Sequence, residues 1–298
     1  MRALAEFIMR GRMQATLVVV VAAIVPLLFW LSAAAACLVL LRRGVRDAAG
    51  ILVWALLPAL VWCYLGDPRL LFVSVGALAL ALLLRAELPW SRVLLCSVGL
   101  GVLYALLISS VSALREPIEA VSLEAQKLWP QLFGADYQQL PVEQRELLQA
   151  SLSPPALIGF AAVTLQMLSV LCLMLGRYWQ ALLYNPGGFG REFRALQLPP
   201  GLALALLAGV LLGASLGPQL GMLKLFCSVP LLLAGLAMLH GVVAEKPSMR
   251  FWLAGAYVCL LVFYPLLIIL AVVDSLMDFR GRLARKKNAK DDSTNGEG

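Results

Sequence analysis

The sequence predicts an all-α fold, a polytopic transmembrane helix bundle of about eight or nine spans with a proline-broken first segment. Of the 298 residues, 61% are hydrophobic and only 14% are charged, more apolar surface than a soluble domain can bury. Apolar runs near the ~20 residues that cross a bilayer alternate with short polar segments. Because lipid offers peptide groups no hydrogen-bond partner, these runs are expected to be helices that satisfy their own backbones.

The charged residues indicate a membrane surface as a partner and argue against nucleic acid. The net charge is +7, from 24 Lys and Arg against 17 Asp and Glu, and almost all of these residues lie between apolar runs or in the tail. Basic loops beside spans favour anionic lipid, whereas nucleic acid needs a basic stripe on a folded surface. We therefore predict the lipid bilayer as a partner, no nucleic acid, and a multi-pass location in a bacterial inner membrane.

Residues 1–15 are expected to form an interfacial amphipathic helix on the inner leaflet. Three arginines accompany one apolar face there, a pattern typical of such helices: Arg2, Arg10 and Arg12, with Leu4, Phe7, Ile8 and Gly11. A solvated, frayed terminus is the alternative.

Residues 16–113 are predicted to be an N-terminal transmembrane region. The run 16–41 contains Pro26 and is too long for the apolar part of a signal peptide. It is either one tilted span or a hairpin broken at the proline. The hairpin would return Arg42, Arg43 and Arg46 to the side of the N-terminal arginines, which the positive-inside rule prefers. Further spans are expected at 48–66, 70–84 and 93–113.

Residues 114–155 are predicted to be an extramembrane amphipathic loop. They hold six acidic and three basic residues, so they fit the outer side of the membrane better than the inner side. Apolar residues recur at helical spacing, and Pro117 and Pro141 suit first helical turns. We expect two short helices resting on the outer face, as a packing lid or as a gate or docking element.

Residues 156–273 are predicted to be a C-terminal transmembrane region, followed by a basic, partly disordered tail at 274–298. Spans are expected at 156–176, 201–216, 222–243 and 251–273. Gly209, Gly213 and Gly217 form a repeated GxxxG pattern, which lets another helix approach closely. The side of the tail stays open, since a hairpin in the first run gives nine crossings and a single span gives eight. A break at Pro265 would return the tail to the side of the basic loops.

Few residues inside the spans could carry chemistry. No Asp or Glu lies in the middle of an apolar run, and the single histidine, His240, is expected to be a packing residue. All six cysteines lie inside apolar runs without a CxxC or Cys/His cluster, and no catalytic motif is present. We predict no catalytic residues, no metal, no cofactor and no enzyme activity. Thr164 and Gln166 lie in mid-span, where they bond helices together or line a substrate-binding cavity.

A polar loop between two spans is the second candidate site. Asn185, Pro186, Gly187 and Gly188 predict a turn, because proline fixes one φ and the glycines accept values that other residues avoid. Two like charges on one helix face cost stability unless a cation joins them. After the last span, Asp274 and Asp278 share such a face. We therefore predict a polar cluster between the last helix and this loop, with three cations available: Arg191, Arg194 and Arg280.

These two motifs resemble the YybS-like family of uncharacterised bacterial inner-membrane proteins. The resemblance rests on NPGGF at 185–189 with Glu192 and Phe193, and on DSLMDFR at 274–280, and extends over most of the chain. That family is distantly similar to the S components of energy-coupling-factor vitamin transporters and to a cell-shape protein of the MreD type. The spans after Ala195 depart from the six-helix pattern of S components. The resemblance implies a membrane-protein partner or an ATPase module, and it assigns no residue a role.

The sequence thus predicts two functions. The first is a small-molecule binding or transport component that resembles S components. The second is a membrane scaffold or assembly factor for envelope machinery, in an MreD-like role. A polar-lined cavity between the first six spans is expected for the former, and a filled bundle for the latter.

Overall fold

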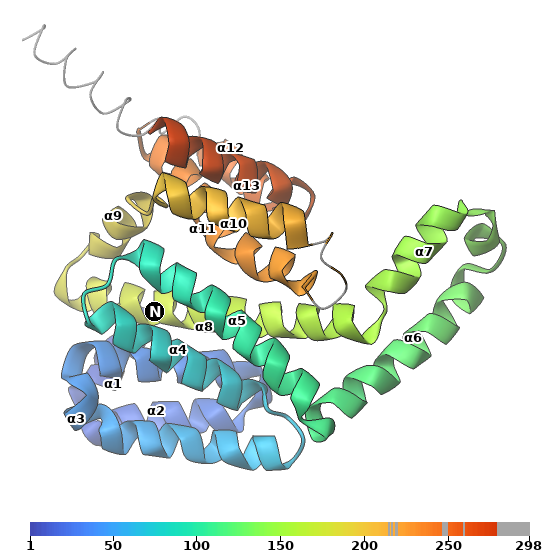
Figure 1. The fold of residues 1–298 in the computed structure, drawn as a ribbon. Coiled ribbons are helices and arrows are strands. Elements are labelled where there is room, and N and C mark those ends of the chain that lie inside the picture. The colour runs from blue at the N-terminus through green and yellow to red at the C-terminus, as the bar shows by residue number, and fades with distance from the viewer. Residues whose placement is uncertain (214, 216, 218–219, 246–249, 259, 279–298) are drawn as a thin grey trace, which may run out of the picture.

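The computed structural model describes residues 1–213, 215, 217, 220–245, 250–258 and 260–278. Within these residues every regular element is a helix, as the sequence predicts (Figure 1). Among the described residues, four helical segments are long and apolar enough to cross a membrane: Pro26–Tyr64, Trp90–Ser110, Pro154–Tyr184 and Met222–Ala244. Shorter apolar helices lie at Arg12–Ile24, Pro200–Gly213 and Tyr264–Met277. The count of eight or nine spans stays a prediction.

The first apolar run is a hairpin. The chain begins with α1 (Arg2–Arg10) and α2 (Arg12–Ile24), turns through η1 (Pro26–Leu28) and returns as α3 (Phe29–Tyr64). The hydroxyl of Ser32 donates to the carbonyl of Val19 at 2.8 Å, and Nη2 of Arg43 donates to the carbonyl of Met9 at 3.2 Å. Pro26 has no N–H to continue a helix, so the chain turns there. The predicted amphipathic helix is shorter than expected, since it ends before Gly11.

A second reversal interrupts α3 at Gly44. This glycine has φ 82° and ψ 172°, which divides α3 into a first limb (29–43) and a second limb (45–64). The positive φ favours glycine at this position, and Nη2 of Arg85, at the flexible end of its side chain, would lie 2.7 Å from a Cβ on Gly44. Residues 32–41 of the first limb are all buried, which makes this limb the centre of the N-terminal half.

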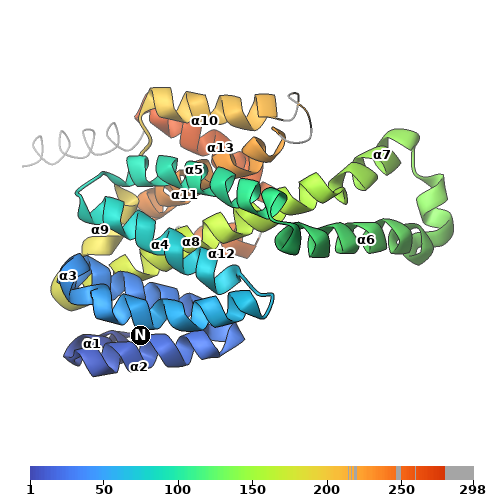
Figure 2. The ribbon, with the colours of Figure 1, turned by 60° about the horizontal axis from the view of Figure 1, so that its bottom comes forward.

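The remaining N-terminal helices are α4 (Arg69–Arg85) and α5 (Trp90–Ser110), followed by a projecting pair. That pair, the α6–α7 hairpin, consists of α6 (Ser112–Gln139) and α7 (Val142–Ser151), and it extends beyond the end of the bundle (Figure 2). The expectation of two short helices differs from the structure, because α6 has 28 residues and contains Pro117 in its interior. Pro141 instead precedes α7, as expected.

The central helix of the molecule is α8 (Pro154–Tyr184), which packs against helices of both halves. A Cβ on Gly176 would lie 2.9 Å from the carbonyl oxygen of Ala34 and 3.1 Å from the amide of Leu38. The α8 backbone therefore touches the α3 backbone. Close approach through glycine and alanine is the usual way in which membrane helices gain packing contacts.

The C-terminal helices form a smaller group on top of α5 and α8 in Figure 1. They are α9 (Gly188–Arg194), α10 (Pro200–Gly213), α11 (Met222–Glu245), α12 (Arg250–Val258) and α13 (Leu260–Met277). Gly209 and Gly213 face Cys227 and Lys224 of α11, while Gly217, with φ 95°, lies in the following turn. Two glycines of the GxxxG pattern thus pack α10 on α11, and the third lies outside the helix.

The described residues of the predicted last span, 251–273, lie in α12 and α13, and residue 259 lies outside the described residues. Pro265, the expected break, is inside α13. Nε2 of Gln197 donates to the carbonyl of Asp274 at 3.0 Å, which places the end of α13 beside the loop after α9.

Candidate functional site at the basic end of the bundle

Arginines from seven helices gather at one end of the bundle. Contacts across that end join Met9 to Arg43, Leu41 to Arg85 and Gln180, and Gln197 to Asp274. We call this the basic end and define it by ten arginines: Arg10, Arg12, Arg42, Arg43, Arg46, Arg85, Arg92, Arg177, Arg191 and Arg194. Fewer carboxylates lie beside these arginines in the chain or at the end of α13: Asp47, Glu87, Glu192, Asp274 and Asp278.

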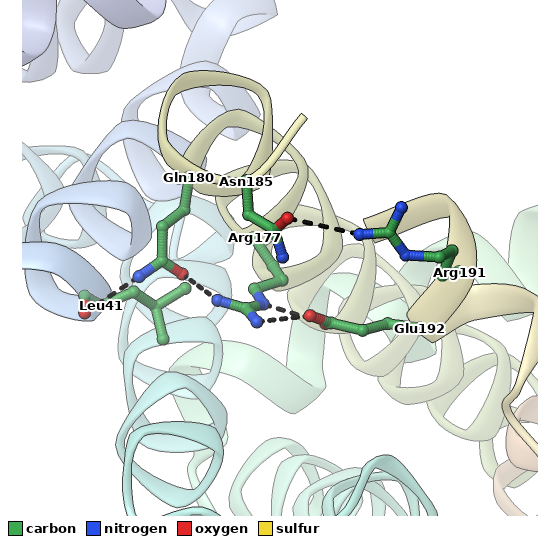
Figure 3. Close-up of polar contacts among 6 residues, drawn as sticks. All are labelled: Leu41, Arg177, Gln180, Asn185, Arg191 and Glu192. Carbon is green, nitrogen blue, oxygen red and sulfur yellow. Dashed lines mark hydrogen bonds and ion pairs between the residues drawn. The ribbon is translucent and has the colours of Figure 1, made fainter. Parts of the chain in front are cut away.

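A polar network fixes α9 to the end of α8 (Figure 3). Nε of Arg177 donates to Oε2 of Glu192 at 3.0 Å, and Nη2 donates to the other carboxylate oxygen. Nη1 of Arg177 donates to Oε1 of Gln180 at 2.6 Å, and Nε2 of Gln180 donates to the carbonyl oxygen of Leu41 at 3.3 Å. Fork-like pairing of this kind fixes orientation as well as position. The network therefore holds α9 against α8 and α3.

The predicted turn at 185–188 begins this arrangement. The amide of Gly188 donates to the carbonyl of Asn185 at 2.8 Å, and Gly187 has φ 78°. A Cβ on Gly188 would overlap the side chain of Asn185. Nη2 of Arg191 donates to Oδ1 of Asn185 at 3.3 Å, so this arginine closes the turn (Figure 3).

The predicted cluster between this loop and the last helix stays a prediction. Asp274 is buried, and its backbone carbonyl is joined to the loop by Gln197. Asp278 follows α13 with φ 46°, and Arg280 lies outside the described residues. Sequence reasoning missed Gln197, although a polar residue between Leu196 and Leu198 was the available signal. It also missed Gln180, whose amide joins α8 to α3.

An aromatic cavity of about 390 Å³ lies between α8, α9, α11 and α12. Phe189 contacts Tyr178 and Trp90 edge-on, with ring centroids 5.9 Å and 6.5 Å apart. Phe193 stacks on Phe189 at 6.2 Å and meets His240 edge-on at 5.3 Å. Six of the lining residues form the aromatic wall of this cavity or supply its polar groups: Tyr178, Phe189, Phe193, Arg194, His240 and Tyr257.

The His240 ring is held in one orientation at the cavity. Nδ1 lies 2.8 Å from the carbonyl oxygen of Leu236, which requires a proton on Nδ1. Nε2 lies 3.3 Å from the hydroxyl of Tyr257, which donates to it when the imidazole is neutral. The expected packing role is thereby extended, since His240 joins α11 to α12 at the cavity wall.

The two mid-span candidates, Thr164 and Gln166, face different surroundings. Gln166 is fully buried and donates to Oγ of Ser97 and to the carbonyl of Phe226, both at 3.2 Å. Its amide therefore joins α8 to α5 and α11. Thr164 is exposed and bonds the carbonyl of Phe160 in its own helix. The structure does not bring the two side chains into one site.

The opposite end of the bundle carries two larger hollows. One of about 580 Å³ includes Thr164, Asp67 and Arg69, and one of about 630 Å³ includes Arg115 and Glu119. Asp67 accepts from Nε and Nη2 of Arg69 at 2.7 Å and 2.6 Å, and these bonds lower the pKa of the Asp67 carboxyl. Arg115 lies 3.3 Å from Glu119 on the same helix.

Comparison of the chain with family models, curated proteins and solved structures gives no match.

Proposed function

We propose that the chain is a multi-pass protein of the bacterial inner membrane, with its basic end in the cytoplasm. The four long apolar helices support membrane insertion, and the ten arginines at one end agree with the positive-inside rule. Eight crossings followed by the α12–α13 pair would bring Asp274 back to the basic end. Cysteines substituted at 191 and 138 are expected to be labelled from opposite sides of the membrane. Labelling of both from one side would contradict this topology.

Within that membrane, we propose that the protein is a non-enzymatic scaffold or assembly factor for envelope machinery. Direct contacts between the central helices at Gln166 and Gly176 support this function most directly. The side-chain amide of Gln166 on α8 donates to Ser97 on α5 and to the carbonyl of Phe226 on α11. The α8 backbone also contacts the α3 backbone at Gly176. The distant similarity of YybS-like proteins to an MreD-type protein agrees with this proposal.

The α6–α7 hairpin is the proposed contact surface for a membrane-protein partner. It projects from the bundle and exposes large apolar side chains, among them Val121, Leu132 and Leu147. A monomer gains nothing from these side chains in water, whereas a partner could bury them.

Photo-crosslinking in living cells tests the scaffold proposal. A photoreactive residue at 132 is expected to give one discrete heterologous adduct, and one at 60, on the exposed side of α3, is expected to give none. Reversing charges at Glu143 and Glu146 should weaken the adduct. Equal smears from both positions, or no adduct at 121, 132 and 147, would contradict a scaffold.

A small-molecule binding or transport component is the second proposal, because the three cavities fall in the size range of ligand sites. An S-component-like protein would also engage an ATPase module. Thermal unfolding of the purified chain with panels of vitamins, lipids and metabolites tests this function. A reproducible shift with a water-soluble metabolite supports it, and no shift with any compound contradicts it.

A further inference from the structure

The α6–α7 hairpin carries a stripe of apolar side chains that begins inside the hollow of about 580 Å³ at the opposite end of the bundle. We propose that the hollow and the stripe together bind one helix of another membrane protein. The membrane span of that helix would lie against the hollow, and its continuation outside the membrane would lie along the stripe, with basic residues on one flank. This inference rests on the proposed scaffold function and names the class of partner.

Six apolar residues follow one another along α6 at alternating intervals of four and three residues. This spacing keeps one side of a helix facing a second helix. The pattern ends before Gly134, whose φ of 44° interrupts α6. We call these residues the α6 stripe: Leu114, Ile118, Val121, Ala125, Leu128 and Leu132.

The outer part of the α6 stripe is exposed. Val121, Leu128 and Leu132 are 60%, 48% and 74% exposed. A neighbouring face of α6 packs on the chain's own backbone instead, where Oγ of Ser122 donates to the carbonyl of Leu152 at 2.6 Å. A row of large apolar side chains in water is typical of a contact surface, because a partner that covers the row removes it from water.

The inner part of the α6 stripe lines the hollow. Leu114 and Ile118 form one side of it, and Ala161 and Thr164 of α8 belong to another side. The hydroxyl of Thr164 bonds the carbonyl of Phe160 within its own helix. Small residues let membrane helices approach closely, so this lining suits a helix. A hollow that continues as a stripe outside the proposed membrane also favours a helix over a lipid, whose acyl chains end at the headgroup.

The charge beside the α6 stripe favours a basic partner. Glu124 is exposed and directly precedes Ala125, so it lies at the edge of the stripe, where a paired helix places its own flanking residues. Residues 114–155 hold six acidic residues against three basic ones. A second copy of the hairpin would bring like charges together, whereas lysine or arginine on the flank of another protein would pair with these acids.

Binding of a defined peptide to the full chain in neutral detergent tests the outer part of the proposal. The probe is a synthetic heptad helix with leucine at its core positions and lysine at its flanking positions, and the comparison peptide has glutamate at the flanks. The lysine peptide is expected to bind about tenfold more tightly, since flanking charges set partner choice. Leu128→Ser should weaken its binding about tenfold, the effect of one lost leucine contact. Leu123→Ser is the matched control, because Leu123 is 57% exposed on the same helix but lies outside the stripe.

Photo-crosslinking in cells tests whether one partner follows both parts of the surface. Photoreactive residues at 128 and 164 are expected to give protein adducts of the same mass, and one at 123 is expected to give none. Equal binding of the two peptides, or an equal loss in Leu123→Ser, would overturn the proposal. So would an adduct of lipid mass at 164. An adduct at 147 without any at 121, 128 and 132 would leave the scaffold function standing and overturn this inference alone.

Discussion

The two ends of the bundle use their charged residues differently. At the basic end, Arg43, Arg85 and Arg177 bond groups that are 34, 44 and 15 residues away in the chain. At the opposite end, Arg69 and Arg115 pair with carboxylates only two and four residues away. Bonds between residues far apart in the chain hold different helices together, whereas pairs two or four residues apart connect only neighbouring turns. The arginines at the basic end therefore stabilise the packing of the helices, and those at the opposite end do not.

The contrast depends first on α8, which joins both ends. Gly176→Ala is expected to destabilise the protein by about 3 kcal/mol, because the new Cβ would press on the α3 backbone, which cannot move aside. Gly99→Ala is the matched control, since nothing lies within 4 Å of its Cβ position on α5. Thermal unfolding in detergent measures both. If Gly176→Ala and Gly99→Ala melted at the same temperature, the α3–α8 contact would not be important for the stability of the bundle.

The ion pair at the basic end gives the next largest effect. Glu192→Gln is expected to cost about 2 kcal/mol, because the half-buried Arg177 loses its charged partner. The double variant with Arg177→Gln should cost less than the sum of the single variants. Unfolding of all three variants, beside the wild type, measures the coupling. Strict additivity would mean that the pair does not fix α9 to α8.

The local pair at the opposite end should matter less. Asp67→Asn is expected to cost under about 1 kcal/mol, since Arg69 is mostly exposed. The bonds from Arg69 lower the pKa of Asp67, so the contribution is complete above the usual carboxyl pKa of about 3.9 and is lost as pH falls through the lowered value. The melting-temperature difference between wild type and Asp67→Asn should therefore stay constant from neutral pH downwards and shrink only in strong acid. If the melting-temperature difference grew as the pH fell, the folded protein would not lower the pKa of Asp67.

The tip of the α6–α7 hairpin should be the most tolerant place. Leu132→Ser is expected to change stability by less than about 0.5 kcal/mol, because this side chain is 74% exposed. Leu173→Ser, in the buried part of α8, provides the contrast and should be strongly destabilising. A large loss of melting temperature in Leu132→Ser would show that the hairpin packs on its own protein.

Much of the helical pattern could be predicted because it depends on local composition. The break at Pro26 follows from a missing N–H, and the turn at 185–188 follows from proline and two glycines. The choice between a tilted span and a hairpin could not be made, since charge counts favour one without excluding the other. Contacts from Ser32 and Arg43 decided it. The reversal at Gly44 could not be predicted, because a glycine inside the basic segment 42–46 does not by itself indicate a change of chain direction.

The candidate site was predicted only in part, because local composition identifies unusual residues without showing what they contact. Composition alone marks Arg191, Arg194 and the glycine turn as unusual, but it gives no partner for them. The partners, Glu192 for Arg177 and Leu41 for Gln180, depend on how α3, α8 and α9 meet. The aromatic cavity joins rings that are up to 167 residues apart, between Trp90 and Tyr257.

The amino-acid sequence by itself determines that these segments are apolar helices, because each peptide group bonds within its own helix and each apolar run avoids water. Which helices touch, and which arginine meets which acceptor, only the tertiary structure decides. Close packing depends on shape at positions such as Gly176, where the absence of one methyl group matters only once the α3 backbone lies beside it.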